Sequence, residues 1–258
     1  MNSDLPHSAL AAAIRDIALA AGEKITAFYR TQFEVRSKAD RSPVTEADEA
    51  AEQFIAAELG KLSPRLPVVA EESVAMGNIP EVGTKPFWLV DPLDGTKEFI
   101  SRNGEFTVNI GLVEDGKPTL GVVYAPAVGR LFWSAGAGRA FAERDGGAAT
   151  PISARRPAAD GVVVVASRSH RDPEEDSYLA TLRVKSLTSA GSSLKFCLVA
   201  AGEADLYPRF GTTNEWDTAA GHAVLAAAGG TVVTRDGAVL GYAKPRFKNP
   251  GFIAKGRA

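Results

Sequence analysis

The fold of this chain is decided by the segment Trp88-Leu89-Val90-Asp91-Pro92-Leu93-Asp94-Gly95-Thr96-Lys97-Glu98-Phe99-Ile100. The apolar run at 87–90, with chain breakers on both sides, predicts a buried strand that ends on a carboxylate. Asp91 and Asp94 follow it across a turn in which Pro92 fixes φ and Gly95 frees the exit, so both carboxylates can converge. Two acids held close together repel each other, and a pair of divalent cations relieves that repulsion.

The residues after this turn predict an anion site. Gly95 and Thr96 begin a short helix in this interpretation, and a helix N-terminus offers free N–H groups to an anion. One turn therefore predicts a metal ion and a phosphate side by side. The alternative is an ordinary surface turn, since Asp, Pro and Gly are the commonest turn formers. The strand before the turn and the distant acids described below favour the metal site.

Composition describes an ordinary globular chain of one domain or two closely joined ones. It has 258 residues, 45% hydrophobic and 23% charged, and a formal charge of −2. That balance gives no overall field that would recruit nucleic acid or an anionic membrane. The single Cys197 excludes an intramolecular disulfide and suits a reducing compartment. No signal segment or apolar membrane span is evident, so we expect a cytoplasmic protein.

A second strand of the N-terminal part also ends on acids. Apolar spacing predicts a helix over 8–29, and Thr45 with Asp48 has capping-box spacing for a helix that ends near Gly60. The run 66–70 predicts a strand followed by Glu71-Glu72. Ligands gather where strand ends meet, so Glu71 and Asp91 are expected to face one cavity. The alternatives are that Asp48 only favours the helix dipole and that Glu71 belongs to a solvated loop.

The rest of the chain predicts two further kinds of structure. Apolar runs at 107–113 and 119–124 flank a hairpin turn, and short strands follow to about 142. The Pro- and Ala-rich stretch 151–160 predicts a boundary between an N-terminal α+β subdomain (1–155), which carries the metal and phosphate turn, and a C-terminal α/β subdomain (156–258), which completes the site. Strands at 162–166, 184–187 and 204–207 alternate there with helices at 172–182, 192–201 and 217–229.

Three segments of the C-terminal part have residues suited to chemistry. Residues 167–170 end on His170 after a buried strand. Residues 191–195 open a helix with hydroxyl groups, free amides and Lys195, which suits a second phosphate. Asp217 stands at a helix start. Alternatives remain open for each: Ser192 and Asp217 could be helix N-caps, and His170 a solvated histidine. Arg209, which follows Tyr207-Pro208, is a further candidate that could be a surface residue.

Three segments together occur in the order and approximate spacing of the two signature motifs of the inositol monophosphatase superfamily, which the chain resembles over nearly its whole length: Glu71-Glu72-Ser73, Asp91-Pro92-Leu93-Asp94-Gly95-Thr96 and Trp216-Asp217-Thr218-Ala219-Ala220-Gly221. Within it, the chain looks like the 3′(2′),5′-bisphosphate nucleotidase branch in Lys97-Glu98-Phe99-Ile100, Ser167-Arg168-Ser169-His170 and Gly191-Ser192-Ser193-Leu194-Lys195-Phe196-Cys197. That branch removes the 3′-phosphate from adenosine 3′,5′-bisphosphate (PAP), a by-product of sulfate activation, to give AMP. The sequence leaves open whether PAP or its sulfated precursor (PAPS) is the preferred substrate.

The resemblance implies a fold, a cofactor and roles for individual residues. The fold is a layered αβαβα sandwich of the inositol monophosphatase and fructose-1,6-bisphosphatase type, with mixed α+β and α/β character. The cofactor is Mg²⁺, as two or three ions, held by Glu71, Asp91, Asp94, Asp217 and the backbone carbonyl of Leu93. The implied catalytic residues are Asp48 and Thr96, which orient the attacking water, together with Glu71. The implied substrate contacts are His170, Ser192, Lys195 and Arg209, with Glu71, Leu93, Asp94, Gly95, Thr96 and Asp217 beside the metal.

The residue types agree with magnesium, because the ligand set is all oxygen, without Cys or His. The resemblance also implies inhibition by lithium. Other functions remain open: an inositol monophosphatase or sugar bisphosphatase of the same fold, or a catalytically silent regulator that binds magnesium and phosphate. A second phosphate site at Ser192, Lys195 and His170 distinguishes the nucleotidase from an enzyme whose substrate has only one phosphate. The charge balance supplies no basic stripe, which argues against a nucleic-acid-binding module. The sequence leaves a monomer or a homodimer open, and peripheral membrane association as well.

Overall fold

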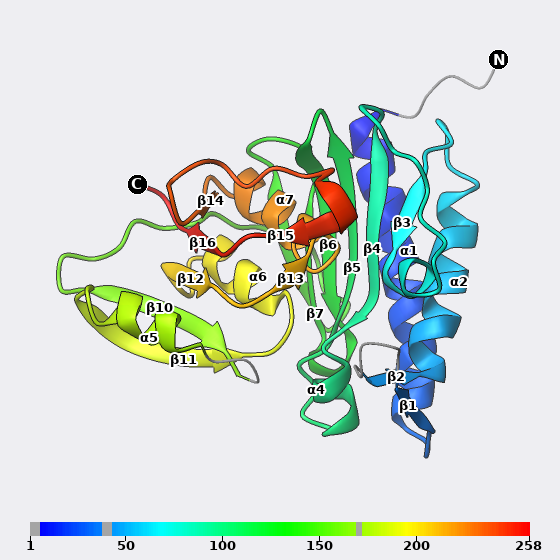
Figure 1. Ribbon diagram of the computed structural model, residues 1–258, viewed down its shortest axis with the longest axis horizontal. Helices are drawn as coiled ribbons and strands as arrows, with labels where there is room; N and C mark the ends of the chain where they lie inside the picture. Colours follow the sequence, from blue (N-terminus) through cyan, green and yellow to red (C-terminus); the bar gives the residue numbers. More distant parts are fainter. Residues whose placement is uncertain (1–5, 38–42, 169–171) are drawn as a thin grey trace.

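Layers of helices and sheets alternate through the molecule, which is seen in a computed structural model (Figure 1) that describes residues 6–37, 43–168 and 172–258. Two helices cover one face of a seven-stranded sheet, two others lie between that sheet and a five-stranded sheet, and one covers the far face of the second sheet. The described chain therefore has the αβαβα layering that the family resemblance implies.

The seven-stranded sheet has its strands in chain order: β3 (Val68–Ala70), β4 (Phe87–Asp94), β5 (Thr107–Glu114), β6 (Lys117–Ala125), β7 (Arg130–Ser134), β8 (Ala140–Arg144) and β9 (Thr150–Pro151). β3 is parallel to β4 and the other pairs are antiparallel. The predicted hairpin is confirmed, because Glu114 pairs with Lys117 at the β5–β6 turn.

The five-stranded sheet has the order β11 (Val184–Ala190), β10 (Val162–Ser167), β12 (Leu206–Arg209), β16 (Phe252–Lys255) and β14 (Thr231–Thr234). Two small sheets pair β1 (Val35–Ser37) with β2 (Pro43–Thr45), and β13 (Thr213–Asn214) with β15 (Lys248–Asn249). The segment 151–160 leads from the first sheet to the second. The division into subdomains at that segment stays a prediction.

The described helices are α1 (His7–Tyr29), α2 (Glu46–Leu59), α3 (Glu71–Ala75), α4 (Thr96–Ile100), α5 (Pro173–Leu179), α6 (Leu194–Ala200) and α7 (Ala219–Ala227), with 3₁₀ turns η1 (Pro126–Val128) and η2 (Pro245–Phe247). The predicted helix over 8–29 is confirmed as α1. The capping box at the start of α2 is confirmed too, with Thr45 Oγ1 accepting from the Ala47 N–H and Asp48 accepting from the Thr45 N–H. No helix in the described ranges is long and apolar enough to cross a membrane.

Three hydrophobic cores fill the spaces between the layers, and β4 contributes to two of them. Phe87 and Leu89 pack into the core shared with α6 and α7, whereas Trp88 and Val90 pack into the core shared with α1 and α2. Because successive side chains of a strand point to opposite faces, a strand covered on both faces must be apolar throughout. This explains why the segment at 87–90 has an unbroken apolar run. The third core joins α5 to the second sheet.

The predicted turn after Val90 is wrong in detail, because β4 continues to Asp94. Asp91 pairs with Asn109 and Asp94 pairs with Thr107, so three steps along β4 face two steps along β5. The extra residue is a β-bulge, a place where a sheet tolerates Pro92. The bulge redirects the end of β4 while keeping Asp91 and Asp94 on a rigid strand. β14 and β16 were not predicted from the sequence.

Candidate metal and phosphate site

A cavity of about 540 Å³ opens where the two sheets and the central helices meet. It lies at the end of β4, at the starts of α3 and α4, and at the end of β12. Its lining includes most of the predicted site residues: Glu71, Asp91, Leu93, Asp94, Gly95, Thr96, Ser192, Lys195, Arg209 and Asp217. Residues from both halves of the sequence therefore meet in one place.

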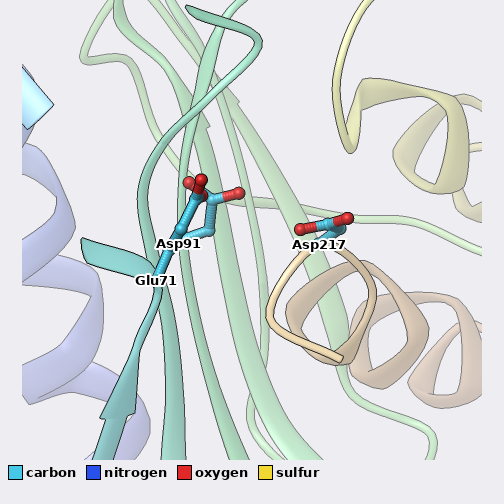
Figure 2. A group of neighbouring side chains, drawn as sticks. All are labelled: Glu71, Asp91 and Asp217. Carbon is cyan, nitrogen blue, oxygen red and sulfur yellow. The ribbon is translucent and has the colours of Figure 1, made fainter. Parts of the chain in front are cut away.

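Three carboxylates from three separate elements lie together in this cavity (Figure 2). One ligand oxygen from each of Glu71, Asp91 and Asp217 lies within 4.8 Å of the others. Glu71 is the first residue of α3, Asp91 lies in β4, and Asp217 comes just before α7. Ala70 pairs with Val90 across β3 and β4, so Glu71, just past the end of β3, lies beside Asp91, the next residue of β4. This arrangement is suited to one or more cations.

Asp94 lines the same cavity and is oriented by neighbours. Its Oδ2 accepts a hydrogen bond from Ser193 Oγ at 2.9 Å, and Asn109 Nδ2 lies 3.5 Å away. Ser193 Oγ also lies 2.9 Å from the backbone oxygen of Asp217. Ser193 thus connects the end of β4 to the segment before α7. Ser193 was not among the predicted site residues, although it follows Ser192 in the predicted phosphate-binding segment 191–195.

Two acids of the cavity, Asp94 and Asp217, hold their protons more tightly than usual. Burial raises the pKa of Asp217 well above its ordinary value, and the charges of Asp94 and Glu71 raise it further. Burial also raises the pKa of Asp94, against the opposing effect of Lys195. A divalent cation would offset both effects by favouring the charged form of each carboxyl. The donors are all oxygen, which fits a hard cation such as magnesium.

Asp48 and Thr96 lie next to this cluster and bond to each other. Thr96 Oγ1 donates to Asp48 Oδ1 at 3.3 Å, and Asp48 Oδ2 accepts from Thr45 Oγ1 at 2.6 Å. Asp48 therefore belongs to the capping box of α2, whose N-cap residue is Thr45, and is also the partner of Thr96. Since the Thr96 hydroxyl uses its proton toward Asp48, its lone pairs are left to accept a hydrogen bond from water.

Gly95 makes the close approach of the two halves possible. Its φ is 90°, a left-handed conformation that favours glycine, and a Cβ there would collide with Ser192 Oγ. Ser192 Oγ lies 2.7 Å from the backbone oxygen of Asp94 and 2.6 Å from that of Glu105. The serine hydroxyl therefore joins the C-terminal part to the end of β4.

The cavity also contains positive charge. Lys195 is 5% exposed, and its Nζ donates to the backbone oxygens of Ser192 at 2.5 Å and Ala190 at 3.3 Å. Burial lowers the pKa of Lys195 to about 8, and Asp94 opposes this shift. Arg209 is buried at the end of β12, with Nη1 3.9 Å from Glu175 Oε1. The predicted contact His170 lies outside the described residues.

The helix-cap alternatives for Ser192 and Asp217 are both wrong. α6 begins at Leu194 after Ser193, and α7 begins at Ala219 after Thr218; neither helix has a side-chain cap bond. Asp217 Oδ2 instead accepts from the backbone N–H of Asn214 at 2.8 Å. These two residues are thus free of the local role that made their interpretation ambiguous.

Comparisons with known proteins agree with this geometry. The model of the "Inositol monophosphatase family" matches residues 7–256. The 3′(2′),5′-bisphosphate nucleotidase CysQ of Escherichia coli (strain K12) is 52% identical over 235 residues, which are 90% of this chain and 94% of that protein. The protein of the same name from Buchnera aphidicola is 44% identical over 246 residues, which are 93% of this chain and 91% of that one.

Solved structures give the same result. The crystal structure of CysQ from Bacteroides thetaiotaomicron matches with a TM-score of 0.81 and 39% identity, and covers 97% of this chain and 98% of that chain. An IMPase of Thermotoga maritima matches with a TM-score of 0.76 and 27% identity, over 94% of this chain and 90% of that chain. The chain therefore belongs to the inositol monophosphatase family.

Proposed function

We propose that this protein is a magnesium-dependent 3′(2′),5′-bisphosphate nucleotidase that removes the 3′-phosphate of adenosine 3′,5′-bisphosphate and releases AMP. The observation that carries the proposal is one cavity that holds the carboxylates Glu71, Asp91 and Asp217 together with the cations Lys195 and Arg209. Relatives that are 44–52% identical over at least 90% of this chain have the name of this activity.

The metal fits the residues present. Glu71, Asp91, Asp94 and Asp217 would hold the ions, with the Leu93 backbone oxygen as a further ligand. The raised pKa values of Asp94 and Asp217 support this, because burial and neighbouring acids disfavour their charged forms despite the positive charges of Lys195 and Arg209. When bound, the ions supply positive charge to the phosphoryl oxygens and make water more acidic.

The chain's own residues orient the reacting groups. Thr45 fixes one oxygen of Asp48, and the other oxygen accepts the proton of the Thr96 hydroxyl. The hydroxyl oxygen of Thr96 is then directed by this bond and accepts a hydrogen bond from the attacking water. Asp48 keeps Thr96 in this orientation and need not be a strong base. Phosphate monoesters hydrolyse very slowly in water, so positioning and charge neutralisation must supply most of the acceleration.

The second phosphate of the substrate requires positive charge in the same cavity. Lys195 has three N–H donors, two of which are used by backbone oxygens, so one is left for a ligand. Arg209 supplies a second cation. Ser192 is proposed as a substrate contact as well, but its hydroxyl proton is directed at backbone oxygens, so it would accept a hydrogen bond from the ligand. His170 remains a proposed contact.

Phosphate release from adenosine 3′,5′-bisphosphate and inositol 1-phosphate, measured side by side with magnesium, tests the proposal. The expected result is a much higher kcat/KM for the adenosine bisphosphate. A preference for the inositol ester would overturn the substrate assignment and leave the metal site standing. No phosphate release from either ester with magnesium present would overturn the enzyme itself.

A comparison with 3′-AMP isolates the second phosphate, because the two adenosine substrates differ only at the 5′ position. Replacing Arg209 with Gln should raise KM for adenosine 3′,5′-bisphosphate much more than KM for 3′-AMP. Equal effects on the two substrates would show that Arg209 does not bind the 5′-phosphate.

We also propose a cytoplasmic location. The single cysteine, Cys197, is buried and unpaired, which suits a reducing compartment. Expression with a fluorescent tag, with cell fractionation as a control, tests this location.

A further inference from the structure

Glu52, a buried carboxylate of α2, bonds to the first turn of α3. Its Oε2 accepts a hydrogen bond from the backbone N–H of Glu72 at 2.7 Å. Its Oε1 accepts from the backbone N–H of Ser73 at 2.8 Å and from the Ser73 hydroxyl at 2.6 Å. Glu52 is only 5% exposed, so water competes little for these bonds. Three short hydrogen bonds therefore fix the start of α3 against α2.

This contact replaces a cap that α3 lacks. The residue at its N-cap position is Ala70, which has no side-chain acceptor, and no side-chain cap bond forms there. The first N–H groups of a helix need acceptors from outside the helix. Glu52 supplies them from a residue about 20 positions earlier in the chain, across the boundary between two helices.

The residue whose direction this contact fixes is Glu71. Glu71 begins α3 immediately before the two residues that Glu52 holds. Its own carboxylate points to the other side, where an oxygen lies within 4.8 Å of oxygens of Asp91 and Asp217. β3 fixes the backbone before Glu71, and Glu52 fixes the backbone after it. The Cα atom of Glu71 and the direction of its Cα–Cβ bond therefore have little freedom.

The same face of α2 supports the other half of the site. Asp48 is four residues before Glu52, so the two side chains lie on one face of the helix. Asp48 is 1% exposed and accepts the hydrogen bond of Thr96. One helix face thus orients Thr96 through Asp48, and the start of α3 through Glu52.

We propose that Glu52 is a positioning residue that holds Glu71 in its metal-binding direction and thereby sets the affinity of the site for its divalent cation. This inference rests on the proposed function, in which Glu71 is a metal ligand. Glu52 acts through the backbone of α3, since it does not line the cavity as described. Groups that orient metal ligands in this way typically change metal affinity strongly when they are replaced.

Glu52→Gln is the direct test. Glutamine has the same shape but only one oxygen, so its NH₂ group would face an N–H donor of α3. The expected result is a dissociation constant for magnesium, measured by calorimetry without substrate, that rises roughly 10–100-fold. The magnesium concentration for half-maximal turnover should rise in parallel, and kcat should recover at saturating magnesium. Glu71→Gln, which removes the ligand itself, should not recover.

Asp205→Asn is the matched control. Asp205 is a buried carboxylate, 2% exposed, that accepts from the Val163 N–H at 2.7 Å and pairs with Arg155. It stands just before β12, at the opposite end of that strand from Arg209. Asp205→Asn should lower the melting temperature but leave the dissociation constant for magnesium unchanged.

The magnesium-binding measurements on Glu52→Gln and its control either support or overturn the proposed role of Glu52. If Glu52→Gln does not fold, Ser73→Ala, which removes only the hydroxyl donor, carries the test with a smaller shift in the same direction. Magnesium binding within about twofold of the wild type would overturn the proposal, because replaced supporting groups cost far more. So would an equal loss in Asp205→Asn. If the wild type binds magnesium and Glu52→Gln weakens that binding as expected, but the wild type releases no phosphate, the proposed function alone is refuted.

Discussion

Asp217→Asn should make the metal-free protein more stable while it abolishes activity. Asparagine keeps an oxygen that can accept the hydrogen bond from the Asn214 N–H, so the local structure has no reason to change. It removes one of three carboxylates whose oxygens lie within 4.8 Å of one another. At that separation, with an effective dielectric constant of about 20, two full charges repel by about 3.5 kcal/mol.

The sign follows from the pKa of Asp217. Burial raises that pKa in the folded state above the ordinary value of 3.8, so the folded state is penalised as the pH rises past 3.8 and the unfolded carboxyl ionises. The penalty is complete once the folded group also ionises. A variant that cannot ionise avoids it and gains on the order of 3 kcal/mol at neutral pH. For a chain of this size that corresponds to a melting temperature roughly 6–12 °C higher.

Thermal unfolding with EDTA and with saturating magnesium measures both sides of this prediction. The wild type should gain about 2.7 kcal/mol when magnesium is at 100 times its dissociation constant, whereas Asp217→Asn should gain much less. Near pH 3.8 the difference between the metal-free proteins should shrink, because the wild-type carboxyl keeps its proton. The exposed acid Asp160, replaced with Asn, is the control. A metal-free Asp217→Asn that is less stable than the wild type at neutral pH would refute the reasoning.

Three further predictions concern the threonine that orients the attacking water, a buried histidine, and the packing of β6 against α7. Thr96→Val should lower kcat on the order of 100-fold or more, with stabilisation by magnesium unchanged; steady-state kinetics that match the wild type would remove its role in orienting water. Burial lowers the pKa of His222 to about 3 from 6.5, so stability is lost as the pH falls from 6.5 toward 3. In urea unfolding, the stability of the wild type should therefore fall by about 2 kcal/mol relative to that of His222→Gln between about pH 7 and pH 5. Gly121→Ala should destabilise the fold by roughly 1–3 kcal/mol, because its Cβ would overlap the backbone of Ala220 in α7; an unchanged melting temperature would contradict that close contact.

Most helices and strands of the fold could be predicted from local sequence patterns. The 3.6-residue spacing of α1, the capping box of α2 and the hairpin at 114–117 are each written in a few neighbouring residues. β16 is different, since it lies between β12 and β14 and pairs antiparallel with both. A strand of four residues contains no local pattern that indicates which distant strands will be its neighbours.

The candidate site divides in the same way. Asp91 and Asp94 were recognisable because a buried apolar strand ended on them, and the family resemblance brought Glu71 and Asp217 into the same set. The bonds of Ser192 to Asp94 and of Glu52 to Ser73 span 98 and 21 residues. Such bonds depend on the tertiary fold and leave no local signal. Helix-cap alternatives for Asp217 could be excluded only by its actual partner, Asn214.

Diffraction from crystals soaked with Mn²⁺, used as a stand-in for Mg²⁺, is the most direct test of the central claim that these acids hold catalytic cations. At the manganese absorption edge, we predict anomalous peaks within coordination distance of Glu71, Asp91 and Asp217 oxygens, in protein that also releases phosphate from adenosine 3′,5′-bisphosphate with that metal. Active protein whose crystals show no anomalous peak among these three carboxylates, or only peaks elsewhere, would contradict the account.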